Sequence, residues 1–196
     1  MGRKPNPERR PEILRAVVDE LARTGLGDLS LRPLAAALGV STYTLTYQFG
    51  SKEELLRAVL EFVESEQAAM ARGAMRDAGG EIGRVVTAYW DWVAEPAHLA
   101  RVRLVFEVLA IPRLSGLLPG DFRARLMSAW VELLSGDLAD AGLGREEAEA
   151  EATVAASALA GMVLDLLATG DRERLNRAAG HLAKRLDDLQ VACRTR

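Results

Sequence analysis

The sequence has little of what several classes of protein require. Its 196 residues include one cysteine, Cys193, and two histidines, His98 and His181, far apart in the chain. One cysteine cannot form a disulfide framework or a cysteine-rich zinc site, and the two histidines do not have metal-binding spacing. Seven prolines and 5% aromatic residues are too few for a proline-rich linker protein. We therefore expect a protein that lies in the reducing environment of the cytoplasm and binds no metal.

Long hydrophobic runs are also missing. The longest stretch without a charged residue, Pro33–Ser51, carries Ser, Thr, Tyr and Gln, and the next, Ala152–Leu164, has only 13 residues. A helix that spans a bilayer needs about 20 apolar residues. The basic N-terminus is followed by charged residues instead of the apolar core of a signal peptide. We expect no membrane partner.

Motifs of enzymes and of cofactor sites are absent as well. The sequence has no G-x-x-x-x-G-K phosphate loop, and Gly25-Leu26-Gly27 lacks the third glycine of a dinucleotide site. His98 follows Pro96 near an expected helix start, where a surface or capping histidine is the ordinary explanation. We expect a protein without catalytic activity and without a cofactor.

The distribution of charge is more informative than its total of −3. Up to Lys52 the chain has eight basic and five acidic residues, and after it 17 basic and 23 acidic residues. A mildly basic N-terminal part therefore precedes an acidic body, which favours a negatively charged partner for the former.

A helical pattern runs through nearly the whole chain. Apolar residues recur at spacings of three and four, with glycine and proline mostly between these stretches. The pattern predicts an all-α fold of about nine helices. Four lie in the N-terminal part: one at about 11–23 and three that open at serines. Five more are predicted at about 81–94, 97–111, 121–140, 145–169 and 171–192.

The three serine-opened helices have specific start signals. Ser30 and Ser41 are each flanked by a pair of apolar residues at the spacing of a hydrophobic staple, and Ser51 and Glu54 form a capping box. Gly39 separates the first two helices, where a tight turn favours glycine. Two short helices joined in this way form a helix-turn-helix, whose second helix enters the major groove of DNA.

The outward face of that second helix is polar and uncharged. We assign to it Thr42, Tyr43, Thr44, Thr46, Tyr47 and Gln48. Hydrogen-bonding groups and threonine methyls are suited to reading base edges. Arg32 and Lys52 flank this helix, and Arg3, Lys4, Arg9 and Arg10 precede it, in positions that favour phosphate attraction. Spacing alone leaves open that the two helices are only packed and that the face is only solvated.

The run from Leu29 to Leu55 resembles the N-terminal DNA-binding domain of the TetR (tetracycline-repressor) family of bacterial regulators. The resemblance rests on Leu29–Ala35, Leu38–Ser41, Thr44-Leu45 and Phe49–Leu55, and it covers about residues 9–60. It implies that residues 1–60 form a DNA-binding domain with a flexible tail at 1–8. Residues 61–196 would then form a domain that binds an effector and dimerises.

The resemblance also implies roles for single residues. Arg32 matches a position that reaches a base or a phosphate, and Thr42, Tyr43 and Thr44 match the start of the recognition helix. Tyr47, Gln48 and Lys52 match phosphate contacts. Two residues depart from the family pattern: Thr46 stands where the family usually has a phosphate-binding tyrosine, and Tyr43 stands where small residues or proline are common. Whether Tyr47 replaces the missing tyrosine stays open.

The C-terminal part offers candidate residues for a dimer interface and for an effector pocket, the two other features that the resemblance implies. Apolar stripes on the last two helices predict a two-fold interface through Ala156, Leu159, Val163, Leu175, Leu182 and Leu186. The alternative is that both stripes face the core of one protomer. Aromatic and charged residues among apolar neighbours give candidate lining residues for an effector pocket: Trp90, Arg103, Phe106, Trp130 and Asp165.

The sequence as a whole predicts a homodimeric, ligand-responsive repressor of transcription in the cytoplasm. Its partners would be a palindromic operator in double-stranded DNA and a small-molecule effector of unknown identity. Two alternatives stay open. One is a helical small-molecule-binding or scaffold protein whose N-terminal domain no longer binds DNA, and the other is an activator or a regulator without an effector.

Overall fold

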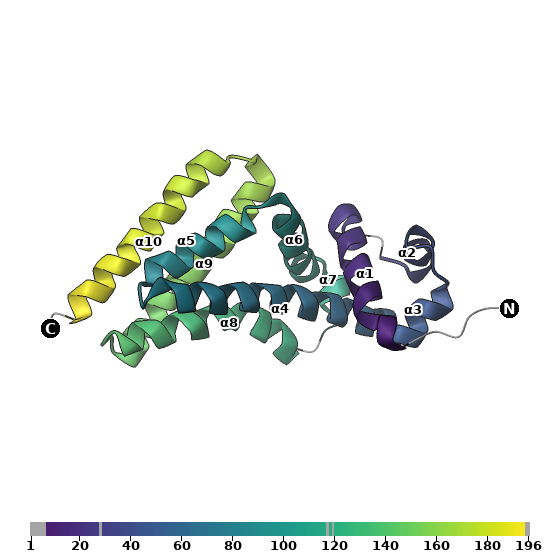
Figure 1. Cartoon of the computed structure of the whole chain (residues 1–196), viewed down its shortest axis with the longest axis horizontal. Coiled ribbons are helices and arrows are strands. Elements are labelled where there is room, and N and C mark those ends of the chain that lie inside the picture. The colour runs from purple at the N-terminus through teal and green to yellow at the C-terminus, as the bar shows by residue number, and fades with distance from the viewer. Residues whose placement is uncertain (1–6, 28, 117, 119, 195–196) are drawn as a thin grey trace. The chain divides into compact units, whose positions relative to one another are not determined.

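The computed structural model describes residues 7–27, 29–116, 118 and 120–194, and within these ranges the chain contains no strand. Figure 1 shows its helices, which confirm the predicted all-α fold. A 3-10 turn η1 (Pro7–Arg9) precedes α1 (Arg10–Thr24), α2 (Leu31–Ala37), α3 (Thr42–Phe49), α4 (Lys52–Ala78), α5 (Ile82–Val93), α6 (Pro96–Ala110), α7 (Pro112–Ser115), α8 (Gly120–Asp140), α9 (Arg145–Thr169) and α10 (Arg172–Arg194). Helix α7 is a single turn that the sequence pattern did not predict. The predicted tail, with Arg3 and Lys4, lies largely outside the described residues.

The chain forms two compact units. The first contains residues 1–65 and 100–123, and the second contains residues 66–99 and 124–196. Helices α4, α6 and α8 each contribute residues to both units. Most of α6 therefore belongs with the N-terminal helices, a grouping that residue order along the chain does not reveal.

Serine start signals in the sequence cap two helices of the first unit, α3 and α4. The Ser41 hydroxyl accepts a hydrogen bond from the backbone N–H of Thr44 at 3.0 Å. Ser51 and Glu54 form the expected reciprocal box, with bonds of 2.7 Å and 3.2 Å. Ser30 precedes α2 as predicted, yet its side chain makes no capping bond. Its flanking residues Leu29 and Leu34 are both buried, so apolar packing fixes this helix start.

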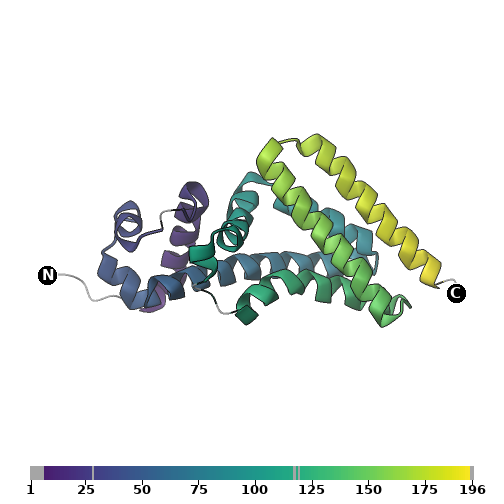
Figure 2. The same ribbon diagram turned by 180° about the vertical axis from the view of Figure 1, so that it is seen from behind.

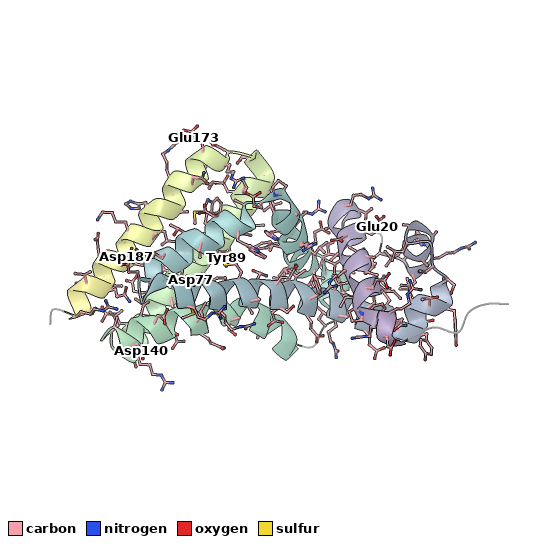
Figure 3. The ribbon with its side chains drawn as sticks, in the orientation of Figure 1. Glu20, Asp77, Tyr89, Asp140, Glu173 and Asp187 are labelled. Atoms are coloured by element: carbon pink, nitrogen blue, oxygen red, sulfur yellow. The ribbon has the colours of Figure 1, made fainter. Side chains whose placement is uncertain are left out.

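In the second unit, α5 packs along α10. Helix α5 is apolar and places Ile82, Val86 and Trp90 in the core. Side chains of α10 accept bonds from the free N–H groups at the start of α5: Asp187 Oδ1 from Gly83 at 2.8 Å and Gln190 Oε1 from Ile82 at 3.4 Å. Figure 3 labels Asp187 on α10 and Tyr89 on α5. The two helices are thus held by buried apolar contact and by polar capping.

Helices α9 and α10 run antiparallel from the turn at Gly170, which has a φ of +69° (Figure 2). Helix α9 is apolar around most of its circumference, and it is long and apolar enough to cross a membrane by length and composition. Core and interface helices of other proteins meet the same criteria. Its outer face is exposed, with Val154 at 53% and Leu164 at 49% of full exposure.

Four of the six residues predicted at a dimer interface are buried inside the protomer, so their assignment is wrong. Leu159, Val163, Leu175 and Leu186 are each 1–2% exposed. Ala156 and Leu182 are half-buried. Both stripes therefore pack within the second unit, as the alternative interpretation held. The other side of α9 is exposed and mostly apolar, and it consists of Val154, Ser157, Gly161, Leu164 and Ala168.

Candidate nucleic-acid interface

Helices α2 and α3 form a helix-turn-helix with a glycine turn. Gly39 has a φ of +63°, the left-handed conformation that glycine adopts at little cost. The backbone N–H of Val40 closes the turn by donating to the carbonyl oxygen of Ala35 at 3.0 Å. Ala35 and Leu45 are 2% and 1% exposed, so the two helices share one apolar core. This core fixes which face of α3 is exposed.

The exposed face of α3 consists of Thr42, Tyr43, Thr46 and Tyr47, which we call the readout face. The tyrosines are the most exposed large side chains of the helix, at 65% and 49%, and their ring centroids lie 6.2 Å apart. Thr44 is half-buried. Gln48 is only 8% exposed, so its assignment to the outward face is wrong. It lies three residues after Leu45, and this spacing places it on the core side of the helix.

The hydroxyls of Thr44 and Thr46 bond within the protein. The Thr46 hydroxyl lies 3.1 Å from the carbonyl oxygen of Tyr43 and 3.3 Å from that of Thr42, to which it donates. The hydroxyl oxygens of Thr44 and Ser41 lie 2.8 Å apart. The readout face therefore offers two aromatic rings with their hydroxyls, and threonine methyl groups beside them.

Cationic side chains flank the readout face. Arg32 at the start of α2 is exposed and Lys52 at the start of α4 is half-exposed. Neither forms an ion pair within the ranges that the structure describes. Two further cations are occupied: Arg9 pairs with Glu12, and Arg10 donates to the carbonyl oxygen of Gln48 at 3.1 Å. Among the residues that the structure describes, none forms an ion pair with Arg32 or Lys52 that would compete with a phosphate.

Arg10 has a positioning role that the sequence did not indicate. Its guanidinium lies 5.2 Å from the ring centroid of Phe49, and it bonds to the backbone at the end of α3. Both contacts hold the C-terminus of α3 against the start of α1. The sequence signal was only a basic residue in the N-terminal tail, because a contact across 38 residues leaves no local pattern.

The polar contacts between α6 and the end of α1 were also missed. Arg103 donates to the carbonyl oxygen of Ala22 at 2.8 Å, and Glu107 accepts from the backbone N–H of Leu26 at 2.6 Å. The Arg103 Nε lies 3.1 Å from Glu107 Oε1, at an angle that gives an ion pair but no hydrogen bond. The pair therefore satisfies backbone groups at the end of α1, where the helix itself has no partners for them.

Gly25 permits this approach. It has a φ of +81°, and a Cβ atom there would lie 3.2 Å from Glu107 Oε2. Any other residue would strain the backbone and crowd the carboxylate. The segment that leads from α1 into the helix-turn-helix is thus fixed by two side chains of α6.

Glu107→Ala is expected to lower the free energy of unfolding by about 1–3 kcal/mol, because the N–H of Leu26 and the guanidinium of Arg103 both lose a partly buried partner. Urea denaturation followed by circular dichroism measures the change. Glu95→Ala is the matched control, since Glu95 forms an exposed ion pair with Arg172, and such pairs contribute about 0–1 kcal/mol. Equal losses in both variants would contradict a specific role for Glu107.

The five residues predicted to line an effector pocket are divided between the two units. Arg103 and Phe106 lie in the first unit, and Trp90, Trp130 and Asp165 lie in the second. Arg103 is engaged as described above, and Phe106 is half-buried.

The three members in the second unit have other partners. Trp90 is 2% exposed and donates through Nε1 to Asn176 at 2.7 Å, so it belongs to the core. The Trp130 ring packs against Tyr89 at a centroid distance of 4.3 Å. Arg174 holds the Asp165 carboxylate with bonds of 2.6 Å and 2.9 Å, and this pairing lowers the pKa of Asp165. Its charge is therefore compensated on the protein surface.

His98 also has a structural role. Its Nδ1 donates to the carbonyl oxygen of Trp92 at 2.9 Å, and its ring stacks on Trp92 with centroids 4.2 Å apart. It thereby caps the end of α5, the helix that precedes it, whereas the sequence had placed it near the start of the next helix.

A comparison with protein families matches residues 13–59 to bacterial regulatory proteins of the tetR family. No curated protein matches the sequence. Among solved structures, a transcriptional regulator from Rhodococcus sp. Rha1 is similar at 22% identity and a TM-score of 0.76, over 92% of this chain and 95% of that one.

Two further solved structures are similar over most of their length. One is a regulator from Rhodococcus sp. assigned to the TetR family, with 21% identity and a TM-score of 0.73 over 94% of this chain and all of that one. The other is the multidrug-binding protein EbrR in complex with imidazole, with 23% identity and a TM-score of 0.62 over 93% of both chains. Identities this low show a shared fold. Together with the family match, they show that residues 13–59 resemble the tetR family of bacterial regulatory proteins and that the chain has the fold of these solved transcriptional regulators.

Proposed function

We propose that this protein is a ligand-responsive repressor that binds a palindromic operator as a homodimer. The observation that carries the proposal is the readout face of α3, which is exposed and flanked by Arg32 and Lys52. Recognition helices of this kind read base edges from the major groove while nearby cations bind phosphates. Residues 1–60 would form the DNA-binding domain and residues 61–196 the effector-binding and dimerisation domain. Such a regulator works in the cytoplasm, where bacterial DNA lies.

The dimer is proposed through the outer face of α9. Its exposed residues Val154, Ser157, Gly161, Leu164 and Ala168 follow one another at spacings of three and four, which places them in one stripe. A helix that is apolar all round is normally buried on all sides, so the exposed stripe favours a partner. Gly161 and Ser157 are small and allow a second helix to approach closely. A two-fold copy would place two α3 helices for half-sites about 34–36 Å apart or a multiple of that distance.

Ligand control is supported by the fold and by one neighbour, EbrR, which is named as a multidrug-binding protein. An effector that binds one conformation of the C-terminal part better than the other would shift the balance between DNA-binding and free states. Coupling of this kind is typically about 1–3 kcal/mol and acts equally in both directions. A tight small-molecule ligand that leaves operator affinity unchanged would refute this part of the proposal.

The decisive experiment is fluorescence anisotropy of the purified protein on DNA from upstream of its own gene, with scrambled DNA as control, in about 0.15 M salt. Specific binding is typically about 10³-fold or more tighter than non-specific binding. We expect that preference, with two protomers per site. If that DNA is not preferred, fragments selected from the whole genome are tested next. Equal weak binding to all fragments would instead favour the scaffold or small-molecule-binding alternative.

Arg32→Ala combined with Lys52→Ala is expected to weaken DNA binding and to reduce its dependence on salt. Each phosphate contact contributes about 0.9 to the slope of log K against log salt concentration. The double variant removes two contacts from each of two protomers, so the slope should become shallower by up to about 3.6. Anisotropy titrations at several salt concentrations measure it. The control is Arg177→Ala with Lys184→Ala, which removes the same charge from exposed positions of α10. A slope that changes equally in both double variants would exclude a direct role for Arg32 and Lys52.

A further inference from the structure

The readout face lacks every group that makes the common bidentate contacts with bases. Helix α3 contains no charged residue, and its one amide side chain, Gln48, is 8% exposed. The usual pairings are arginine or lysine with guanine, asparagine or glutamine with adenine, and glutamate or aspartate with cytosine. None of them is available on the exposed surface of α3. Sequence selection by this helix must use other contacts.

The groups that remain are largely apolar. Tyr43, in the first turn of α3, is 65% exposed, and its ring lies one helical turn from that of Tyr47, with an angle of 43° between their planes. The hydroxyl of Thr46 donates to the backbone of the same helix, which leaves its methyl group as the part not bonded to the helix. In a helix, residues 43, 46 and 47 are neighbours on one face. They form a surface of two rings and a methyl group.

One base in DNA presents an apolar group in the major groove, the C5-methyl of thymine. We infer that α3 selects its half-site mainly by apolar contact with thymine methyl groups, and that Tyr43 and Thr46 make this contact. The inference rests on the proposed function, since it specifies which DNA the same helix prefers. It assigns to α3 a half-site with thymine at the positions that face the first two turns of the helix.

Tyr47 completes the surface without being required to read a base. It lies one turn further from the N-terminus of α3, and the N-terminal residues of a recognition helix are those that reach base edges. The flanking cations Arg32 and Lys52 supply phosphate attraction that is independent of sequence. Selectivity and affinity would thus come from different residues, which allows them to be tested separately.

The test uses duplexes that the wild-type protein enriches from a random-sequence pool. Each thymine is replaced in turn by deoxyuridine, which keeps the hydrogen-bonding groups and removes only the methyl group. One buried methyl group contributes about 0.8 kcal/mol, so we expect about fourfold weaker binding at a contacted thymine and about 15-fold when both half-sites are changed. Deoxyuridine outside the protected sequence is the control and should have no effect.

Variants of the readout face then assign the contact. Tyr43→Ala or Thr46→Ser should abolish the effect of deoxyuridine at the corresponding position. Tyr43→Phe keeps the ring and Thr46→Val keeps a methyl group, so both variants should retain the effect of deoxyuridine on binding. Circular dichroism melting curves confirm that each variant is folded.

The outcomes separate the inference from the proposed function. If an enriched duplex binds specifically and no deoxyuridine substitution weakens binding, α3 reads DNA in another way and the inference is overturned. If the variants Tyr43→Ala and Thr46→Ser keep the deoxyuridine effect, the methyl contact belongs to other residues and the assignment is overturned. If the wild-type protein enriches no duplex at all, the proposed function fails and the inference fails with it.

Discussion

Leu164→Lys on α9 is expected to leave the protein monomeric and to lower its operator affinity by about 10²-fold or more. Leu164 is 49% exposed in the single chain, in the middle of the apolar stripe. Across a two-fold interface the substitution would bury two ammonium groups without partners, which is strongly unfavourable. A monomer also loses the gain of about 10²–10⁴ that arises when two linked sites bind one DNA.

Sedimentation velocity measures the oligomeric state, and fluorescence anisotropy measures the affinity. Ala69→Lys is the control, because Ala69 is exposed on α4 and the substitution adds the same charge outside the stripe. We expect the control to remain dimeric and to bind as the wild type does. A Leu164→Lys protein that sediments as a dimer would show that the α9 stripe is not the interface.

Leu45→Ala is expected to lower the free energy of unfolding by about 2–5 kcal/mol, the usual cost of removing a buried leucine side chain. Leu45 is 1% exposed and anchors α3 to the core that it shares with Ala35 of α2. Urea denaturation measures the loss. DNA binding should fall as well, because the readout face would lose its fixed orientation.

Tyr47→Ala provides the contrast on the same helix. Tyr47 is 49% exposed, and exposed substitutions usually change stability by less than about 0.5 kcal/mol. If Leu45→Ala and Tyr47→Ala destabilised the protein equally, the division of α3 into a buried side and a readout face would be wrong.

Local signals in the sequence predicted the helices well. Ser41 and the Ser51–Glu54 box cap their helices as expected, because capping depends on residues only three positions apart. Helix α7 was missed because Pro112 suggested a break between helices. Proline also favours the first position of a helix, and here it begins one.

The faces of the helices were harder to predict. Helix α9 has apolar residues on nearly every side, so periodicity cannot tell its core side from its exposed side, and the interface was assigned to Leu159 and Val163, which are buried. In α3, six polar residues were placed on one face. A helix with 3.6 residues per turn cannot hold all six there, and Gln48 lies on the core side.

Contacts between distant residues could not be predicted from the sequence. Arg103 was assigned to a pocket because a charged residue among apolar neighbours suggests a ligand, and its neighbour Glu107 was given no role. In the structure they bind backbone groups at Ala22 and Leu26, each 81 residues away in the chain. No local pattern encodes such a pairing.

The most direct test of the central claim, that α3 and its flanking cations bind DNA, is amide hydrogen exchange measured by mass spectrometry with and without an enriched duplex. The account predicts slower exchange in peptides that cover residues 31–52, with exchange in α5 unchanged. If the protein binds the duplex and exchange in residues 31–52 does not slow, the claim that α3 and its flanking cations bind DNA is contradicted.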